Sequence, residues 1–251
     1  MMCGHCGCSS EKARLSEPGV EAHSHLHQDG DSLHLQQALL AGNDELALHN
    51  RQWLTANQIT CINLMGTPGA GKTQLLEATF AYAHTQSGTG WPPMAVLEGD
   101  QQTQNDARRI QACGGRAVQI NTGTGCHLDA QMIQAGLASL APRPGSLVLV
   151  ENVGNLVCPA LFDLGEQHRV AMMAVTDGED KPEKYPHLFA GCELVVINKI
   201  DLQPYLNVDL KKTKASLRRL NPRVEILELS ASTGEGLESW RDWLLTRAHH
   251  D

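Results

Sequence analysis

A glycine-rich stretch in the first third of the chain constrains the fold more than any other feature. Residues 59–65 are mostly apolar and typical of a buried strand, and the next eight residues, Gly-Thr-Pro-Gly-Ala-Gly-Lys-Thr, fit the pattern G-x-x-x-x-G-K-[ST]. Glycines in this pattern let backbone N–H groups converge on phosphate oxygens, while the lysine adds positive charge and the threonine hydroxyl can bind Mg²⁺. We therefore predict a nucleotide site between a strand and a helix. The loop residues expected to contact the nucleotide are Gly66, Thr67, Pro68, Gly69, Ala70, Gly71, Lys72 and Thr73, with Thr73 also a Mg²⁺ ligand.

The rest of the chain alternates short apolar runs with amphipathic segments. This alternation is typical of an α/β fold with a mainly parallel sheet and helices on both faces, as in P-loop NTPases. The expected strands are residues 59–65, 94–98, 117–120, 146–151, 169–176, 193–198 and 224–230. The expected helices are residues 72–84, 103–112, 128–140, 207–220 and 236–247. Because ligands bind at the carboxyl ends of parallel strands, the loops after these strands should meet at one edge of the sheet.

Two segments precede this nucleotide-binding domain, which we expect to span residues 58–251. Residues 1–30 contain almost no core-forming side chains, so we expect a flexible tail. Residues 31–57 carry leucines and a tryptophan among polar positions, which predicts one helix, or two that are separated near Gly42-Asn43.

Composition argues against several classes of function. The net charge of −8 argues against a nucleic-acid partner, because phosphate contacts need a basic surface. No apolar run is long enough to cross a bilayer, and the start of the chain lacks the pattern of a secretory signal. We therefore expect a cytoplasmic protein without a membrane partner.

Three of the eight cysteines lie at the start of the chain. Cys3, Cys6 and Cys8 form C-x-x-C-x-C, and three thiolates at this spacing can surround Ni²⁺ in square-planar or Zn²⁺ in tetrahedral coordination. A redox-active or incidental cysteine group is the alternative. The alternating histidines within residues 23–27 are either an auxiliary metal site or a solvated polar tract.

Two segments near the C-terminus indicate which nucleotide is bound. Asn198-Lys199-Ile-Asp201 follows an apolar run and resembles the N-K-x-D motif of GTPases. The Asp201 carboxylate can accept hydrogen bonds from the guanine N1–H and amine, which adenine does not offer, while Asn198 and Lys199 would brace the loop and cover the base. Ser230-Ala231 resembles the loop that contacts guanine O6. The pattern favours GTP over ATP, and so argues against a small-molecule kinase.

Acidic residues follow two of the predicted strands. Glu98 and Asp100 lie where a Mg²⁺-linked switch is expected, and Asp100 is the better candidate to order the metal and the attacking water, with Lys72 as the second catalytic residue. Glu151 and Gly154 occupy the place of a Walker B D-x-x-G segment, with glutamate in place of aspartate, so Glu151 could act through water. No general base is evident, which is consistent with the slow hydrolysis of switch GTPases.

A second candidate metal site lies on the nucleotide side of the predicted sheet. Cys126, His127 and Cys158 come just after predicted strands and offer two thiolates and an imidazole. They are one ligand short of a closed tetrahedral site, which a second chain could complete on a two-fold axis. Ordinary buried residues are the alternative. The remaining cysteines have apolar neighbours and are interpreted as structural: Cys61, Cys113 and Cys192.

Six stretches together resemble the HypB family of hydrogenase nickel-incorporation GTPases. They are G-T-P-G-A-G-K-T, E-G-D-Q-Q-T, N-T-G-T-G-C-H-L-D-A-Q-M, E-N-V-G-N-L-V-C-P-A, G-E-D-K-P-x-K-Y-P-H and N-K-I-D-L. The resemblance covers residues 58–251, and the cysteine-rich start matches a tight nickel site of some members. It implies nickel delivery to the precursor of the [NiFe]-hydrogenase large subunit, together with a small zinc-containing accessory protein. It also implies a homodimer in the GTP-bound state, with nickel or zinc at Cys126, His127 and Cys158.

We therefore expect GTP and Mg²⁺ to order residues 98–103 and 151–154 and thereby to bias dimerisation and metal geometry. Two other functions stay open. A sister family of GTPases delivers nickel to urease, but the C-x-x-C-x-C start and the E-N-V-G-N-L-V-C-P-A stretch favour hydrogenase. A nickel or zinc storage protein with a vestigial GTP site is disfavoured by the intact Lys72, Thr73 and Asp201.

Overall fold

A seven-stranded parallel sheet forms the centre of the molecule. The computed structural model describes residues 29–85, 90–100, 105–123 and 125–248. The strand order is β3-β2-β4-β1-β5-β6-β7, and every neighbouring pair is parallel. The strands are β1 (Thr60–Gly66), β2 (Met94–Asp100), β3 (Arg116–Asn121), β4 (Leu147–Glu151), β5 (His168–Ala174), β6 (Leu194–Asn198) and β7 (Glu225–Glu228). All seven predicted strands are present, and the predicted fold class is confirmed.

Nine α-helices lie within the described ranges. They are α1 (Asp29–Ala56), α2 (Lys72–Thr85), α3 (Asn105–Ala112), α4 (Ala130–Leu140), α5 (Cys158–Leu161), α6 (Lys181–Lys184), α7 (Pro186–Ala190), α8 (Leu210–Leu220) and α9 (Leu237–Ala248). Two short 3₁₀ helices are η1 (Val175–Asp177) and η2 (Ile200–Tyr205). The predicted helices correspond to α2, α3, α4, α8 and α9. Helices α5 to α7 were not predicted, because one helical turn is too short to show a periodic pattern.

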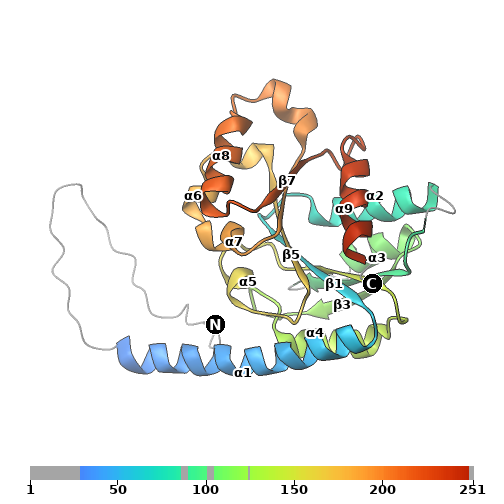
Figure 1. Ribbon diagram of the computed structural model, residues 1–251, viewed down its shortest axis with the longest axis vertical. Helices are drawn as coiled ribbons and strands as arrows, with labels where there is room; N and C mark the ends of the chain where they lie inside the picture. Colours follow the sequence, from blue (N-terminus) through green and yellow to red (C-terminus); the bar gives the residue numbers. More distant parts are fainter. Residues whose placement is uncertain (1–28, 86–89, 101–104, 124, 249–251) are drawn as a thin grey trace.

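Helices cover both faces of the sheet, because successive side chains of each strand point to opposite sides. On one face α2, α3 and α9 pack on the strands, with Leu75 and Trp240 in the core. On the other face α1 and α4 contribute Leu54 and Ile133, while α7 and α8 cover the far strands with residues such as Phe189. Figure 1 shows α2 and α9 on one side of the sheet and α6 to α8 on the other.

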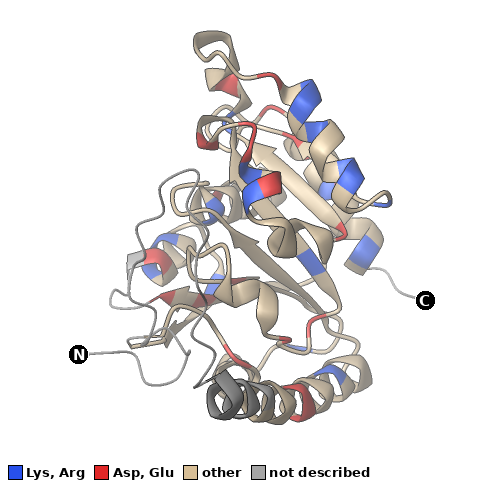
Figure 2. Cartoon of the chain, turned by 90° about the vertical axis from the view of Figure 1, so that its left-hand side faces the viewer, with Lys and Arg blue, Asp and Glu red and all other residues tan. Residues whose placement is uncertain are grey.

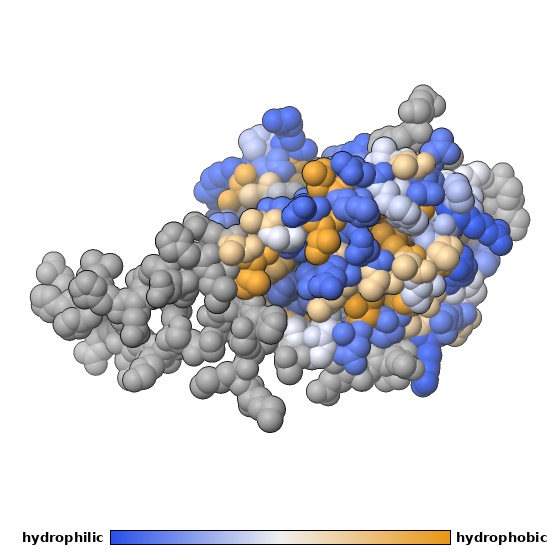
Figure 3. Space-filling view, turned by 90° about the horizontal axis from the view of Figure 1, so that it is seen from below, coloured by the Kyte–Doolittle hydropathy of each residue, from blue (hydrophilic) through white to orange (hydrophobic). Residues whose placement is uncertain are grey.

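Helix α1 is continuous through Gly42-Asn43 and begins at Asp29, two residues before the segment expected to be helical. Its C-terminal half packs along α4, and its N-terminal half extends beyond the sheet (Figure 1). Leu39, Leu48 and Trp53 of this helix are exposed. The face seen from below shows hydrophobic residues interspersed with hydrophilic ones (Figure 3).

Four predictions concern segments that lie wholly or almost wholly outside the described ranges. They are the flexible tail of residues 1–30, the thiolates of Cys3, Cys6 and Cys8, the histidines within residues 23–27, and residues 101–103 of the predicted switch. Within the described ranges, no helix has the length and hydropathy required to cross a bilayer.

Basic residues are concentrated along α8 (Figure 2). Several of them are paired with acids. Lys212 lies 3.5 Å from Glu179, and Arg219 lies 2.7 Å from Glu183. These exposed ion pairs neutralise part of the positive charge of the helix, although each contributes little to stability.

Trp240 joins the C-terminal helix to the helix that follows the phosphate loop. Its side chain is buried, and its indole Nε1–H donates a hydrogen bond to Thr79 Oγ1 of α2 at 2.9 Å. The rings of Trp240 and Trp243 stack with their centroids 5.8 Å apart. Helix α9 therefore supports α2 through both apolar packing and a buried hydrogen bond.

We predict that Trp240→Ala lowers the free energy of unfolding by about 3–5 kcal/mol, because it leaves a large cavity. Trp53→Ala is the matched control, since Trp53 is 38% exposed, and its loss should be about 1 kcal/mol or less. Urea denaturation of both variants measures the difference. An equal loss of unfolding free energy in the two variants would contradict the role assigned to Trp240 in the core.

Candidate nucleotide and metal site

The phosphate loop leaves β1 at Gly66 and enters α2 at Lys72. Gly69 and Gly71 have φ angles of +75° and +89°, in the left-handed region that side chains disfavour. A Cβ atom at Gly71 would also lie 2.7 Å from Asn198 Nδ2. Both the positive φ angle and the short distance to Asn198 therefore favour glycine at position 71.

A cavity of about 270 Å³ opens beside this loop. Its lining residues are Gly69, Gly71, Lys72, Thr73, Gln74, Arg109, Glu151 and Lys199. All of these except Gln74 and Arg109 were predicted to contact the nucleotide or its metal ion. The cavity therefore brings together residues from three separate motifs.

Arg109 of α3 is one of the two lining residues that sequence analysis missed. Its guanidinium donates hydrogen bonds to both carboxylate oxygens of Glu77, at 2.9 and 2.7 Å, and to Asp106 at 3.0 Å. These two acids hold the positively charged guanidinium at the wall of the cavity beside the phosphate loop. No motif marks the residue, because an arginine in a polar helix normally faces solvent.

The side chain of Asn198 connects three of the predicted nucleotide segments. Its Nδ2 donates to the carbonyl oxygen of Ala70 at 2.8 Å, and its Oδ1 accepts from the Ala231 N–H at 3.0 Å. Asn198 is fully buried. The loop after β4 also approaches the phosphate loop, because a Cβ at Gly154 would lie 3.3 Å from the Cα of Pro68.

The segment after β6 offers acceptors that suit a guanine base. Lys199 has a φ of +63°, and η2 begins directly after it. Asp201 Oδ1 is buried and has no hydrogen-bond partner among the described residues. Ser230 is buried, and its hydroxyl accepts from the Thr233 N–H at 3.2 Å. An unsatisfied carboxylate oxygen fits the N–H donors of guanine.

Glu98 and Glu151 form an acid pair near the carboxyl ends of β2 and β4, two neighbouring strands that place them directly opposite each other. Both are buried, and Glu151 Oε1 accepts from the Thr73 hydroxyl at 2.9 Å. Burial, the negative charge of Glu151 and the hydrogen bond to it raise the pKa of Glu98 to about 10. Burial also raises the pKa of Glu151, against the opposing effect of Lys72.

The donor set of the acid pair fits a hard divalent cation. Glu98 Oε1 and Glu151 Oε2 are buried and have no hydrogen-bond partner among the described residues. Asp100, the predicted catalytic acid, lies at the end of β2 but does not line the cavity described above. Its carbonyl oxygen accepts from the Thr122 N–H at 3.0 Å, which ties β2 to the loop after β3.

Cys126, His127 and Cys158 form a second site, which we call the Cys–His cluster. One potential ligand atom from each lies within 4.8 Å of the others. The two sulfur atoms are 2.9 Å apart, and Cys126 Sγ is 3.7 Å from His127 Nδ1. The His127 ring stacks on Phe162 with centroids 3.9 Å apart. This donor set suits Zn²⁺ or Ni²⁺ and leaves a further coordination position.

The protonation of the cluster also suits a metal site. Burial lowers the pKa of His127, partly opposed by the nearby Asp129, and so favours the neutral imidazole that binds metals. By contrast, Cys61 and Cys192 are fully buried, and burial raises the pKa of both thiols. These two cysteines stay protonated and pack in the core.

Asn152 connects the acid pair to the Cys–His cluster. It follows Glu151 directly, and its Oδ1 accepts from the Leu128 N–H at 3.3 Å and from the Val153 N–H at 2.9 Å. Its Nδ2 donates to Asn63 Oδ1 of β1 at 3.3 Å. Sequence analysis did not single out this residue, although a polar residue directly after a buried apolar strand is a usable signal.

The fold and these two sites define a P-loop nucleotide-binding protein with a thiolate–imidazole cluster beside its nucleotide loops. A family model described as the nucleotide-binding domain of CobW/HypB/UreG proteins matches residues 60–228. Together with the relatives described next, this match shows that the chain belongs to the HypB family of hydrogenase maturation factors, and the resemblance seen in the sequence is confirmed.

The chain is 49% identical over 215 residues to the hydrogenase maturation factor HypB of Escherichia coli (strain K12), covering 86% of this chain and 72% of that protein. The crystal structure of HypB from Archaeoglobus fulgidus has a TM-score of 0.75 and 40% identity, covering 84% of this chain and 100% of the other. The crystal structure of HypB from Helicobacter pylori in complex with nickel has a TM-score of 0.75 and 32% identity. The match covers 82% of this chain and 95% of the other.

The acid pair should make the nucleotide-free and metal-free protein sensitive to pH. Glu98 stays protonated in the folded chain until about pH 10 but ionises near pH 4.5 in the unfolded chain, so folding becomes less favourable as pH rises above 4.5. Glu98→Gln removes this penalty. We expect the variant to be more stable than the parent at pH 8 by on the order of 1–3 kcal/mol, with the gain vanishing near pH 5.

Urea denaturation with a chelator present measures this difference at both pH values. Glu45→Gln, an exposed carboxylate of α1, is the control and should show no pH-dependent gain. A gain of equal size at pH 5 and pH 8 would contradict a protonated Glu98.

Proposed function

We propose that this protein is a GTPase that delivers nickel during the maturation of [NiFe]-hydrogenase. The observation that carries the proposal is the position of the Cys–His cluster beside the nucleotide loops, with Asn152 bonded between them. Family membership supports nickel as the cargo, since the Helicobacter pylori relative forms a complex with nickel. The relatives' name, hydrogenase maturation factor, supports the receiving enzyme.

The nucleotide is GTP in this proposal. The buried acceptor of Asp201 and the loop at Ser230-Ala231 support recognition of guanine. Lys72 and the backbone N–H groups of the phosphate loop bind the outer phosphates. Thr73 would hold Mg²⁺, with Glu98 and Glu151 close by, and the ion would neutralise charge on the phosphate oxygens during hydrolysis.

The protein's own groups respond to the nucleotide as follows. Glu98 and Glu151 would hold the cation as two carboxylates, and the raised pKa of Glu98 would then fall so that its proton leaves. The Glu151 carboxylate and the Thr73 hydroxyl would change position together, because they are hydrogen-bonded. Asn152 follows Glu151 in the chain and carries this shift to the Leu128 N–H, next to His127. Asp100 orients the attacking water, and the absence of an evident base in the sequence favours slow turnover.

The Cys–His cluster supplies three ligands, and a second chain completes it when two GTP-bound copies associate. Hydrolysis then loosens the dimer and releases Ni²⁺ to a small zinc-containing accessory protein and the hydrogenase large-subunit precursor. Cys3, Cys6 and Cys8 form a second nickel site in this scheme. These events take place in the cytoplasm.

The first experiment measures Ni²⁺ affinity with GDP and with a non-hydrolysable GTP analogue, together with the sedimentation mass. Cys3, Cys6 and Cys8 are replaced by serine throughout, so that only the inner site is observed. We expect a GTP-dependent dimer with altered nickel affinity, and at least about 10-fold weaker binding in Cys126→Ala. Cys113→Ala, a partly buried thiol outside the cluster, is the control. If the nickel affinity and the sedimentation mass are the same with both nucleotides, the result would instead indicate a nickel-storage protein.

A second experiment tests guanine recognition. Asp201→Asn should lower GTP affinity by at least about 100-fold, because an amide cannot accept both guanine N–H bonds. The same variant should gain affinity for XTP, whose base carries a carbonyl where guanine carries its amine. Asp209→Asn, which retains an N-cap residue of α8, should bind GTP as the parent does. Titration of labelled nucleotides reports these affinities, and unchanged GTP binding in Asp201→Asn would reject the assignment.

A further inference from the structure

Two buried asparagines of α1 each bind both of the segments that carry the ligands of the Cys–His cluster. Asn43 Nδ2 donates to the carbonyl oxygen of Asp163 at 2.8 Å, and its Oδ1 accepts from the Ala130 N–H at 2.9 Å. Asn50 Nδ2 donates to the carbonyl oxygens of Ala130, at 2.8 Å, and Leu164, at 3.0 Å. The two residues are 8% and 2% exposed.

The backbone partners of these asparagines lie close to the ligands along the chain. Ala130 is the first residue of α4 and follows His127 by three positions. Asp163 and Leu164 follow α5, whose first residue is Cys158. Through these hydrogen bonds, α1 connects the residue at the start of α4, just after Cys126 and His127, to the residues just after α5, which carries Cys158.

Contacts between the two segments transmit this arrangement to the ligands. Phe162, next to Asp163, stacks on the ring of His127. On the other segment, the Asp129 carboxylate caps α4 by accepting from the Met132 N–H at 2.7 Å. A shift of either segment against α1 would consequently change the position of the imidazole relative to the two thiolates.

Helix α1 fits closely against the turn that follows α5. Gly165 has a φ of +88°, and a Cβ at this position would lie 2.6 Å from the Cβ of Asn50. Arg51 donates to both carboxylate oxygens of Asp163, at 2.7 and 2.9 Å. The turn therefore has little freedom to slide along the helix.

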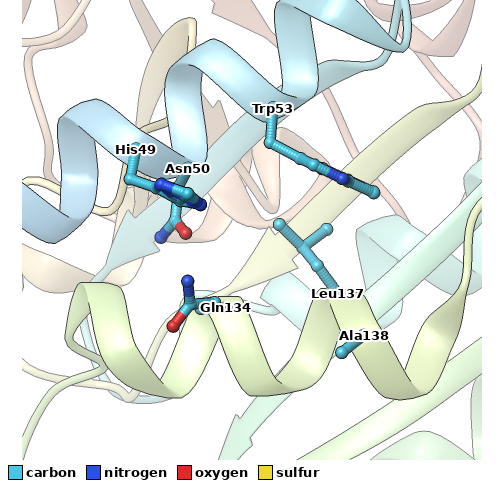
Figure 4. Close-up of a pocket in the computed structure, with 6 residues that line it drawn as sticks. All are labelled: His49, Asn50, Trp53, Gln134, Leu137 and Ala138. Atoms are coloured by element: carbon cyan, nitrogen blue, oxygen red, sulfur yellow. The ribbon is translucent and has the colours of Figure 1, made fainter.

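Figure 4 shows Asn50 pointing from α1 toward α4. It lies at the wall of a cavity of about 260 Å³, which is lined by His49, Asn50, Trp53, Gln134, Leu137 and Ala138. A larger apolar residue would fill more of this space than an amide does. The amide instead supplies directional hydrogen bonds, and its removal would take a donor away from the carbonyl groups of Ala130 and Leu164.

We propose that Asn43 and Asn50 are positioning residues for the Cys–His cluster. By holding Ala130 at a set distance from Asp163 and Leu164, they determine the spacing of the thiolates and the imidazole, and with it the affinity and coordination geometry for Ni²⁺. The inference rests on the proposed function in one respect, that the cluster binds nickel.

The test compares Asn43→Ala and Asn50→Ala in the full chain, with Cys3, Cys6 and Cys8 replaced by serine in every protein. Competition with a chromophoric chelator measures the Kd for Ni²⁺, and thiolate-to-nickel absorption reports the coordination geometry. We expect Ni²⁺ binding to weaken by about 10–100-fold, the usual effect of losing a group that orients a ligand, and the absorption bands to shift. Affinity for GDP should be unchanged, because the phosphate loop keeps all its contacts.

Two variants in or next to α1 are the controls. Asn57 directly follows α1, and among the described residues its amide bonds only to the Trp53 carbonyl, at 2.8 Å, so Asn57→Ala should behave as the parent. Leu54→Ala removes a fully buried side chain that forms no hydrogen bond, so it should lower stability without changing nickel binding. If Asn50→Ala does not fold, Asn43→Ala decides, because it keeps the bonds of Asn50.

Three results would overturn the inference. The first is parental nickel affinity and absorption in the asparagine variants. The second is an equal loss of nickel binding in Leu54→Ala, which would indicate an effect of stability alone. The third is a parent that binds no nickel after the serine replacements, which would also reject the proposed nickel site and is therefore distinguishable from the other two.

Discussion

Parallel pairing of the strands is the constraint on which both sites depend. Since every described strand pair is parallel, the loops that follow β1, β2, β4 and β6 leave the same edge of the sheet. Residues separated by more than a hundred positions, such as Ala70 and Asn198, consequently come within hydrogen-bond distance. The nucleotide loops and the ligand loops of the Cys–His cluster share this edge because the topology allows no other place for them.

Buried asparagines hold these loops together. Asn198 joins the phosphate loop to the loop at Ser230-Ala231, which is proposed to contact guanine. Asn152 joins the acid pair to the loop that carries His127. Asn43 and Asn50 join the segment that carries Cys126 and His127 to the one that carries Cys158. A neutral amide suits this task, because it both donates and accepts and its burial costs far less than that of a charge. Ionisable side chains are also buried at this edge, in the acid pair of Glu98 and Glu151, where a cation is proposed to bind.

Features that depend on local sequence were predicted well. The seven strands follow from short apolar runs, and the phosphate loop follows from the fixed spacing of Gly66, Gly69, Gly71 and Lys72, which a single turn of backbone requires. The Cys–His cluster was predicted from residue type and from its place after predicted strands. Helices α5 to α7 were not predicted, because segments of four or five residues are too short to show the periodic pattern of hydrophobic residues that marks a helix.

Long-range bonds were decided only by the tertiary structure. Asn43 and Ala130 are 87 positions apart, and Asn152 and Leu128 are 24 apart. No local pattern distinguishes Asn43 from an asparagine that faces solvent, and the same holds for Arg109. The sequence by itself therefore determined the strands, the longer helices, the nucleotide motifs and the candidate ligands, since these are properties of neighbouring residues. Which polar side chains are buried, and which loops they join, depends on packing between distant segments.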